Sequence, residues 1–430
     1  MKSRAPGPHV EAMDRHGLRV ALLCYRGNPR CGGQGVYARH LSHALVAAGH
    51  SVTVFSGQPY PELDPGVEIE PIPSLDLYRD ADPFRRPRLR EIGSFADLAE
   101  LVTMWSGGFG EPRAFSWRAA DVLSSRRNDF DVIHDNHGLG TGILSLARAG
   151  WPVLASVHHP VTIDKALDLC HAENLRRRLV LRRWYGFSKM QSRVARRLCR
   201  LVTVSEVARA DVISEMRVDP ARVAVVPLGV RPSTWRPIDT IARVPGRIMT
   251  TTSADVPLKG LAYLIEALAK IRTERDDAHL VVVGALREGG AVDLAIEQFG
   301  LRGFVQFVGG ESDDEVVRRY AEASVAVVPS LYEGFSLPAI EAMACGAPLV
   351  VTSAGALPEV VGRSGEAAIV VDPADAGALA HAITELLTDG DRAERLGAAG
   401  RIRARSCYSW ERVAAATAEQ YRLVMAERPC

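Results

Sequence analysis

Two stretches of this 430-residue chain repeat the same alternation of short apolar runs and longer helical segments. The first stretch extends from LRVALLCY (18–25) to VAVVPLGV (223–230), and the second begins at RIMTTTSA (247–254). Such alternation is typical of βαβ units, which place their strands in a parallel sheet. The sequence therefore predicts an α/β protein with two doubly wound, Rossmann-like lobes facing a central cleft, because open sheets of this kind bind ligands at the carboxyl ends of their strands.

The boundary between the lobes is predicted at RPSTWRP, directly after residue 230. We expect an N-terminal lobe over 1–230 and a C-terminal lobe over 231–408, in agreement with a chain too long for one ordinary core. Residues 59–128 are rich in Pro, Arg and Asp and form the least regular part. The last segment, 409–430, predicts a helix capped by Ser409, and its pattern alone does not decide which lobe it packs on.

Composition restricts the class of protein and of partner. Hydrophobic residues make up 47%, charged residues 24%, and the net charge is +1. These values are typical of a soluble globular protein and give no general attraction to nucleic acid, so we expect no nucleic-acid partner. The seven cysteines are scattered without a CxxC pair or a Cys/His cluster, so no metal site is expected. The N-terminus lacks a signal-peptide h-region, and together these features predict a cytoplasmic protein in a reducing compartment.

The segment PSLYEGFSLPAIEAMACGAPLV (329–350) holds two glutamates eight residues apart, Glu333 and Glu341. The preceding SVAVVPS predicts a buried strand, Ser336 suits the N-cap of a helix, and Pro338 suits its first turn. Both glutamates would then lie at the carboxyl edge of a sheet, where ligands bind. The alternative is a helix start whose glutamates only favour the helix dipole.

Three further loops are candidates for binding. Gly33 and Gly35 in CGGQG follow the first strand and let backbone N–H groups approach a phosphate or sugar, although the spacing is not that of a nicotinamide-binding loop. Lys259 opens a helix in the second lobe, where a cation suits a diphosphate. His158, in VHHP, ends a first-lobe strand. The alternatives are a plain turn for the glycine loop, a solvated side chain for Lys259 and a structural role for His158. His134 and His137 are rival candidates for the role of His158.

These motifs, in this order, resemble family 4 retaining glycosyltransferases, which have the two-lobed GT-B fold. The most specific match is the E-x7-E motif, EGFSLPAIE, followed by AMACGAPLVVTSAGALPEVVG. GGQG, VVPLGV, the KG of DVPLKG and the terminal YSWERVA also match in order. The resemblance covers nearly the whole chain and is weakest over 59–128. In this family the last helix crosses back onto the first lobe, so 409–430 is expected to do the same.

The resemblance implies a nucleoside-diphosphate sugar as the donor substrate, held mainly by the second lobe, with no cofactor and no metal. Glu341 would bind the ribose and Glu333 the donor sugar, while Lys259 and the backbone at the helix start would bind the diphosphate. His158 would contact the reacting sugar. The implied catalytic residues are His158 and Glu333; the implied nucleotide-sugar-binding residues are Gly33, Gly35, Lys259, Glu333, Gly334, Phe335, Ser336, Leu337 and Glu341.

One departure from the family concerns the diphosphate site. The family places an arginine five or six residues before its lysine, and here Ala254 and Ser253 occupy those positions. Loss of one cation weakens neutralisation of the leaving diphosphate. Another arginine, or the hydroxyls of TTTS, would have to compensate.

The expected activity is retaining, metal-independent transfer of a sugar to an acceptor hydroxyl on a lipid-linked, glycan or small-molecule acceptor. A UDP-sugar is expected before a GDP-sugar. The alternatives are a sugar-nucleotide epimerase of the same fold and a non-catalytic two-lobed sugar-binding protein.

Residues 171–200 contain ten Arg or Lys and one acid, with interleaved aromatic residues. This pattern predicts a basic amphipathic helix that lies on an anionic membrane surface, peripherally on the inner face. The alternatives are a solvated face paired with acids elsewhere, or a pocket for an anionic acceptor.

Overall fold

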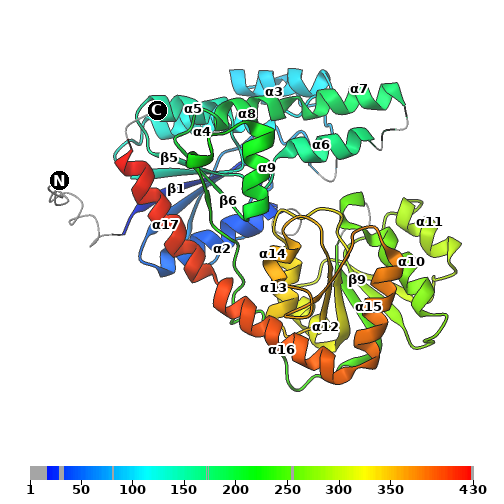
Figure 1. Cartoon of the computed structure of the whole chain (residues 1–430). Coiled ribbons are helices and arrows are strands. Elements are labelled where there is room, and N and C mark those ends of the chain that lie inside the picture. The colour runs from blue at the N-terminus through cyan, green and yellow to red at the C-terminus, as the bar shows by residue number, and fades with distance from the viewer. Residues whose placement is uncertain are drawn as a thin grey trace. The chain divides into compact units, whose positions relative to one another are not determined.

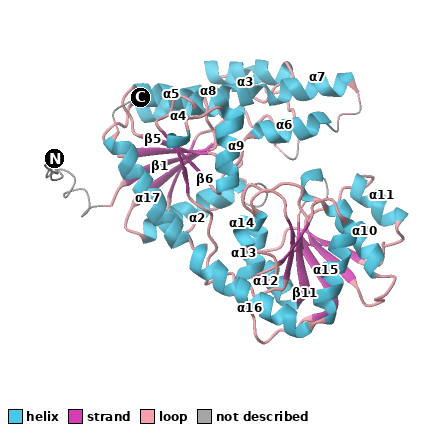
Figure 2. Ribbon diagram, in the orientation of Figure 1, coloured by secondary structure: helices cyan, strands magenta, loops and turns pink. Residues whose placement is uncertain are grey.

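A computed structural model of the chain describes residues 17–28, 33–79, 82–170, 172, 174–252 and 256–427. The chain forms two compact units. Unit 1 comprises the chain up to Val204, Arg209–Val226 and the chain from Glu411 onward, and unit 2 comprises Ser205–Ala208 and Pro227–Trp410. Each unit is built around one parallel sheet with helices on both faces (Figure 1, Figure 2).

The sheet of unit 1 has the order β3-β2-β1-β4-β5-β6-β7, and all its pairings are parallel. Its strands are β1 (Arg19–Cys24), β2 (Ser51–Ser56), β3 (Glu68–Pro71), β4 (Val132–Asn136), β5 (Val153–Ser156), β6 (Arg200–Thr203) and β7 (Val223–Val225). The helices that accompany them are α2 (Gly33–Ala47), α3 (Phe95–Trp105), α4 (Glu111–Ser124), α5 (Thr141–Arg148), α6 (Val161–Cys170), α7 (Leu175–Trp184), α8 (Ser188–Ala195), α9 (Glu206–Met216) and α17 (Trp410–Ala426).

Alternation along these strands assigns the two faces of the sheet. Ile133 of β4 and Ala155 of β5 face a core shared with α4, α5, α8 and α9. The next residues along each strand, His134 and Ser156, are also buried but point to the opposite face, because successive side chains of a strand alternate. Tyr37 of α2 and Tyr421 of α17 contact them there, so these two helices cover the second face.

The sheet of unit 2 has the order β10-β9-β8-β11-β12-β13 and is also parallel throughout. Its core joins β8, β9, β11 and β12 to the apolar faces of α10, α11 and α15. The strands are β8 (Val244–Thr251), β9 (His279–Val283), β10 (Val305–Val308), β11 (Ala323–Val328), β12 (Leu349–Thr352) and β13 (Ile369–Val371). The helices are α10 (Leu261–Ile271), α11 (Ala291–Gln298), α12 (Asp313–Glu322), α13 (Leu337–Ala344), α14 (Leu357–Val361), α15 (Ala376–Thr388) and α16 (Gly390–Cys407).

The structure corrects the prediction of one basic amphipathic helix over 171–200. The segment contains α7, a short 3-10 turn (Tyr185–Phe187) and α8, and Arg200 already belongs to β6. Helix α8 is packed in the core of unit 1. The ring of Trp184 is partly buried and packs against Tyr78 and Phe109 at centroid distances of 5.7 and 5.2 Å, within an aromatic cluster.

The structure also has one disulfide-bonded cysteine, which the reducing compartment expected from the sequence does not favour. Cys199 takes part in a disulfide bond, whereas Cys24, Cys170, Cys345 and Cys407 are free thiols. The scattered spacing of the cysteines gave no signal for this bond.

Candidate functional site

The predicted donor-site residues of unit 2 follow two adjacent strands. The strand order reverses between β8 and β11, so the loops after these two strands diverge to opposite sides of the sheet. Lys259 lies in the loop after β8, and Glu333 lies in the loop after β11. Residues distant in the sequence therefore meet at the position where open α/β sheets bind ligands.

Glu333 is held by a cation and a hydroxyl. Lys259 Nζ and Ser330 Oγ each donate a hydrogen bond of 2.7 Å to the same atom, Glu333 Oε1. Glu333 is only 8% exposed. An ionised carboxylate has two acceptor oxygens, so Oε2 keeps the capacity to accept hydrogen bonds from hydroxyl groups of a ligand.

Two glycines allow the backbone to approach this pair. Gly260 has φ +66°, and a Cβ there would lie 1.9 Å from the carbonyl oxygen of Pro329. Gly355 has φ +56°, and a Cβ there would lie 2.1 Å from the carbonyl oxygen of Glu333. The glycine of the KG dipeptide is therefore required by the packing of the two loops, which keeps the neighbouring Lys259 close to Glu333.

Helix α13 begins where the E-x7-E motif predicts. Ser336 is its N-cap, and its hydroxyl accepts a hydrogen bond from Ala339 N at 3.3 Å. Ser336 has φ +99°, a conformation that non-glycine residues rarely adopt and that is frequent at functional sites. The first N–H groups of a helix have no acceptor within the helix, so this end of α13, including Gly334, Phe335 and Leu337, suits an anionic group.

Glu341 lies one turn into α13 and is half-buried. Burial, assisted by the negative charge of Asp313, raises the pKa of Glu341 to about 8. Its carboxyl group therefore carries a proton at neutral pH and can exchange hydrogen bonds with a diol. One cation, a helix N-terminus and two carboxyl groups within unit 2 suit a ligand that has a diphosphate between two polyhydroxylated groups.

In unit 1 the strand order reverses between β1 and β4. Gly33 and Gly35 lie in the first turn of α2 rather than in the loop that the sequence predicted. A Cβ on Gly35 would lie 2.3 Å from the carbonyl oxygen of Asn28, so packing requires this glycine, whereas a Cβ on Gly33 would meet nothing within 4 Å. Residues 29–32 of this loop, and the departing positions 253 and 254 of unit 2, lie outside the described residues.

His158 lies in a bend just beyond β5, rather than at the end of the strand as the sequence predicted. Its Nε2 is 2.8 Å from Asn136 Oδ1, which accepts hydrogen bonds only, so Nε2 carries the proton. Burial and the nearby His159 lower the pKa of His158 to about 3, which keeps the ring neutral. His159 Nε2 instead lies 2.8 Å from Asp164 Oδ2.

The rival histidines have structural surroundings. His134 is fully buried between α17 and β5. The ring of His137 stacks on that of His158 at 5.6 Å, and its Nδ1 accepts a hydrogen bond from His158 N. Asn136 was not among the predicted site residues, and neither was Ser330, whose three-residue spacing from Glu333 carries no recognised signal.

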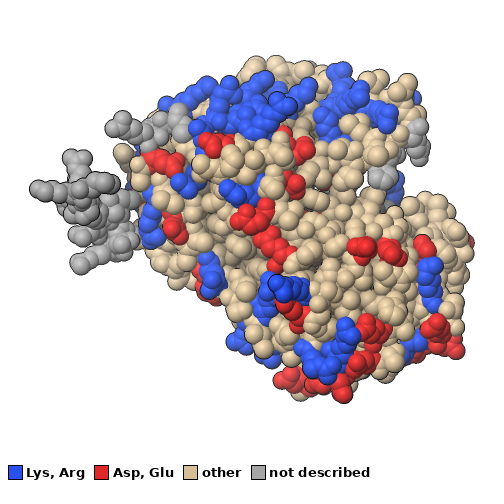
Figure 3. All heavy atoms as spheres, viewed as in Figure 1, with Lys and Arg blue, Asp and Glu red and all other residues tan. Residues whose placement is uncertain are grey.

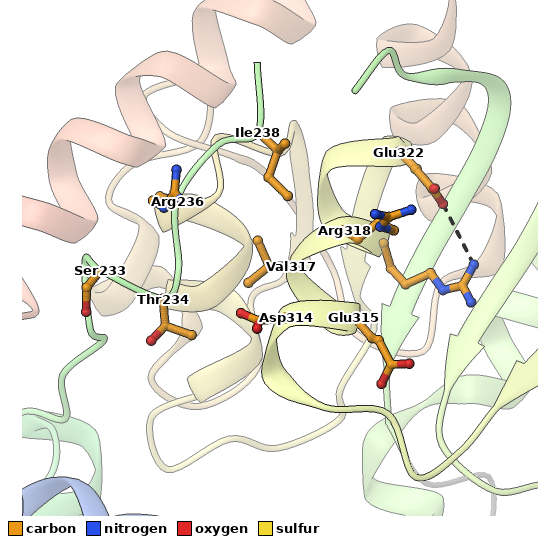
Figure 4. Close-up of a pocket in the computed structure, with 10 residues that line it drawn as sticks. Ser233, Thr234, Arg236, Ile238, Asp314, Glu315, Val317, Arg318 and Glu322 are labelled. Atoms are coloured by element: carbon orange, nitrogen blue, oxygen red, sulfur yellow. Dashed lines mark ion pairs between the residues drawn. The ribbon is translucent and has the colours of Figure 1, made fainter. Parts of the chain in front are cut away.

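A surface hollow of about 740 Å³ lies elsewhere in unit 2, between α12 and the segment 233–238 (Figure 4). Asp314 and Glu315 from the start of α12 and Arg236 from the facing segment line it. None of the predicted donor-site residues is among its lining residues. Over the described part of the chain, no group of three or more His, Cys, Asp or Glu side chains could hold a metal ion.

The chain matches two glycosyltransferase family models and is similar to several known glycosyltransferases. The family described as Glycosyltransferase Family 4 matches residues 31–234, and Glycosyl transferases group 1 matches residues 243–403. MMP alpha-(1->4)-mannosyltransferase of Mycolicibacterium hassiacum is 50% identical, covering 95% of this chain and 99% of that protein. D-inositol 3-phosphate glycosyltransferase of Streptomyces scabiei is 27% identical, covering 96% and 93%.

Solved structures show the same fold. Sucrose-phosphate synthase from Thermosynechococcus elongatus has a TM-score of 0.70 at 24% identity, covering 95% of this chain and 99% of that chain. Anabaena HepE, solved with UDP and glucose, has a TM-score of 0.69 at 17% identity, covering 94% and 99%. The chain, with one parallel α/β sheet in each of its two units, therefore has the GT-B type of fold. Among the described residues, no helix has the length and apolar character needed to cross a membrane.

Proposed function

We propose a mannosyl donor and an acceptor 4-hydroxyl for this chain, which belongs to glycosyltransferase family 4 and transfers a sugar from a sugar donor to an acceptor. The relative that is 50% identical over nearly the full length of both chains is named for α-(1→4) mannosyl transfer, and that observation supports the choice of sugar and of the acceptor 4-hydroxyl. The epimerase and the non-catalytic sugar-binding alternatives are not retained, because the chain belongs to a family of transferases.

The proposed donor site is the Lys259–Glu333 pair together with the start of α13. Glu341 binds the ribose, Glu333 binds hydroxyls of the mannosyl group, and Lys259 with the α13 N-terminus neutralises the diphosphate. The bond between the anomeric carbon and the diphosphate oxygen breaks, and the acceptor oxygen attacks from the same face. Because the attack is on the face that the diphosphate leaves, the anomeric configuration is retained. The acceptor proton passes to the leaving diphosphate, and in this proposal no metal ion takes part.

The nucleotide base stays a separate part of the proposal. A UDP-sugar was expected before a GDP-sugar. The name of the mannosyl relative specifies a sugar but no base. Both UDP-linked and GDP-linked sugars therefore belong in the test.

The experiment is a transfer assay with purified protein, UDP- and GDP-linked mannose and glucose, and short mannosides as acceptors. Mass spectrometry of the product identifies the sugar, and NMR of the new anomeric proton identifies the configuration. Product formed from a mannosyl donor, with α-configuration and with full rate in EDTA, supports the proposal. Transfer only from glucosyl donors would contradict the choice of sugar. A β-linked product would contradict the retained configuration, and loss of rate in EDTA would contradict metal independence.

We also propose that unit 1 associates peripherally with an anionic membrane surface, through a surface that differs in part from the predicted one. Helix α3 presents four exposed apolar side chains at helical spacing, Phe95, Leu98, Val102 and Trp105, with exposed fractions of 48–74%. Phe84, Arg86, Met104 and Trp105 line a hollow of about 420 Å³ beside them. We call these residues of α3, with Phe84, the apolar stripe.

Basic residues adjoin the apolar stripe. Arg183 of α7 donates through Nε to the carbonyl oxygen of Ser106, directly after α3, so the two helices are neighbours. Helix α7 exposes Arg176, Arg177, Arg178 and Arg182 as well. Figure 3 shows Lys and Arg gathered over the helices of unit 1. Exposed aromatic residues beside arginines suit an anionic bilayer surface, which attracts basic residues by roughly 1 kcal/mol each.

A further inference from the structure

A line of buried polar groups connects α17 to the centre of unit 1. Tyr421 Oη lies 2.7 Å from His134 Nδ1, and His134 Nε2 lies 2.6 Å from Ser156 Oγ. Ser156 Oγ lies 3.2 Å from Tyr37 Oη on α2. All four residues are at most 5% exposed. We call these four residues the polar relay, and its first and second members are 287 positions apart in the sequence.

Chemistry fixes the direction of the hydrogen bonds. Burial lowers the pKa of His134 to about 3, so the ring is neutral and donates from one nitrogen only. Within the described part of the chain, the Tyr421 hydroxyl has His134 as its hydrogen-bond partner, and a buried hydroxyl must donate its proton. Tyr421 therefore donates to Nδ1, His134 donates from Nε2 to Ser156, and Ser156 donates to Tyr37.

The polar relay ends beside the predicted catalytic histidine. The ring of Tyr37 packs edge-on against His158, with centroids 4.7 Å apart and an interplanar angle of 73°. A ring held by a hydrogen bond at its far end has less freedom to rotate away from this contact. On the other side, His158 is held by Asn136 and by the stacked ring of His137.

We propose that Tyr421 is a positioning residue: through His134, Ser156 and Tyr37 it fixes the orientation of His158, so the docking of α17 sets the geometry of the reacting centre. The inference rests on the proposed function, because it takes His158 as the residue that contacts the reacting sugar. Sequence reasoning assigned α17 only a packing role and treated His134 as a rival of His158. The polar relay makes His134 an intermediate link instead.

The test compares Tyr421→Phe and Ser156→Ala with Val424→Ala, a buried apolar truncation on the same helix. Both relay variants are expected to lower kcat about tenfold with the KM for the donor unchanged within twofold. Val424→Ala is expected to lower thermal stability while kcat stays at the wild-type value. If Tyr421→Phe fails to fold, Ser156→Ala decides, because it removes one oxygen from the middle of the polar relay.

A spectroscopic measurement is independent of activity. ¹⁵N-resolved NMR of the histidine rings is expected to show His134 as the Nε2–H tautomer in the wild type and as a shifted mixture in Tyr421→Phe. A wild-type His134 in the Nδ1–H form, or relay variants whose kcat equals that of Val424→Ala, would overturn the inference. If instead His158→Ala keeps full transfer while the tautomer shift is observed, the assigned role of His158 fails and the polar relay remains only a structural feature.

Discussion

Lys259 Nζ donates a 2.7 Å hydrogen bond to Oε1 of Glu333, a residue 74 positions later in the sequence. The two meet because β8 and β11 are neighbours in the sheet of unit 2 and both loops leave its carboxyl edge. The pair places a cation and a carboxylate beside the N-terminus of α13. Its geometry supports a donor site whose parts come from two separate βα loops.

Gly260→Ala is predicted to destabilise unit 2. The substitution places a Cβ 1.9 Å from the carbonyl oxygen of Pro329 at a position with φ +66°. Gly300→Ala is the matched control, since its φ is +67° and a Cβ there meets nothing within 4 Å. Urea denaturation should give a loss of about 1 kcal/mol for Gly300→Ala from the backbone conformation alone. Gly260→Ala should lose about 1–3 kcal/mol more from the clash, and equal losses would refute the packing argument.

Nucleotide affinity is predicted to rise with pH through Glu341. The pKa of its carboxyl group is raised to about 8, and ribose hydroxyls donate best to the ionised form. At pH 7 about a tenth of the groups is ionised and at pH 9 about nine tenths, so affinity for a nucleoside diphosphate should increase about tenfold. Calorimetric titration with UDP and with GDP measures this. Glu341→Gln should bind more weakly and remove the dependence; an unchanged pH profile in that variant would assign it to another group.

Substitution of the two adjacent histidines is predicted to have unequal effects. His158 contacts Asn136 and Tyr37, whereas His159 Nε2 lies 2.8 Å from Asp164 Oδ2. His158→Ala should lower kcat at least about tenfold, as loss of one positioned polar group commonly does. His159→Ala serves as the matched neighbour and should keep kcat near the wild-type value. The opposite result, loss of transfer in His159→Ala alone, would exchange the assigned roles.

Membrane association is predicted to depend on the apolar stripe and on salt. Co-sedimentation with phosphatidylglycerol vesicles should be strong at low ionic strength and weak at high ionic strength, because basic residues provide much of the attraction. Trp105→Glu should abolish binding. Ile402→Glu, at an equally exposed apolar position of unit 2, should leave binding unchanged. No binding of the wild-type protein at low salt would end this proposal.

The sequence predicted those features of the fold and of the site that depend on local residue patterns. Parallel strands that alternate with helices gave both sheets, and the E-x7-E spacing gave the N-cap at Ser336 because strand, cap and helix are contiguous in the chain. The contact between Lys259 and Glu333 was not predicted, because it depends on β8 and β11 being neighbours in the sheet. Likewise, the contact between His134 and Tyr421 depends on how α17 docks, and no periodicity encodes a pairing over that distance.

For residues 171–200 the local pattern itself led to a wrong prediction. Charge and aromatic content suggested one surface helix, but the segment breaks at Tyr185, and Trp184 joins an aromatic cluster with Tyr78 and Phe109. Composition does not distinguish an aromatic side chain at the surface from one buried under a neighbouring helix. Exposed aromatic residues of unit 1, Phe84, Phe95 and Trp105, lie instead within 59–128, the region that gave the weakest signal.

The most direct test of the donor site is the sugar-transfer turnover of Lys259→Ala and Glu333→Ala. The matched controls are Lys270→Ala and Glu266→Ala, which alter an exposed ion pair on α10. Each site variant should lose at least about tenfold in turnover, since both groups are proposed to contact the donor, while circular dichroism and melting temperature stay close to those of the controls. Turnover near the wild-type value in both site variants would contradict the placement of the donor at the Lys259–Glu333 pair.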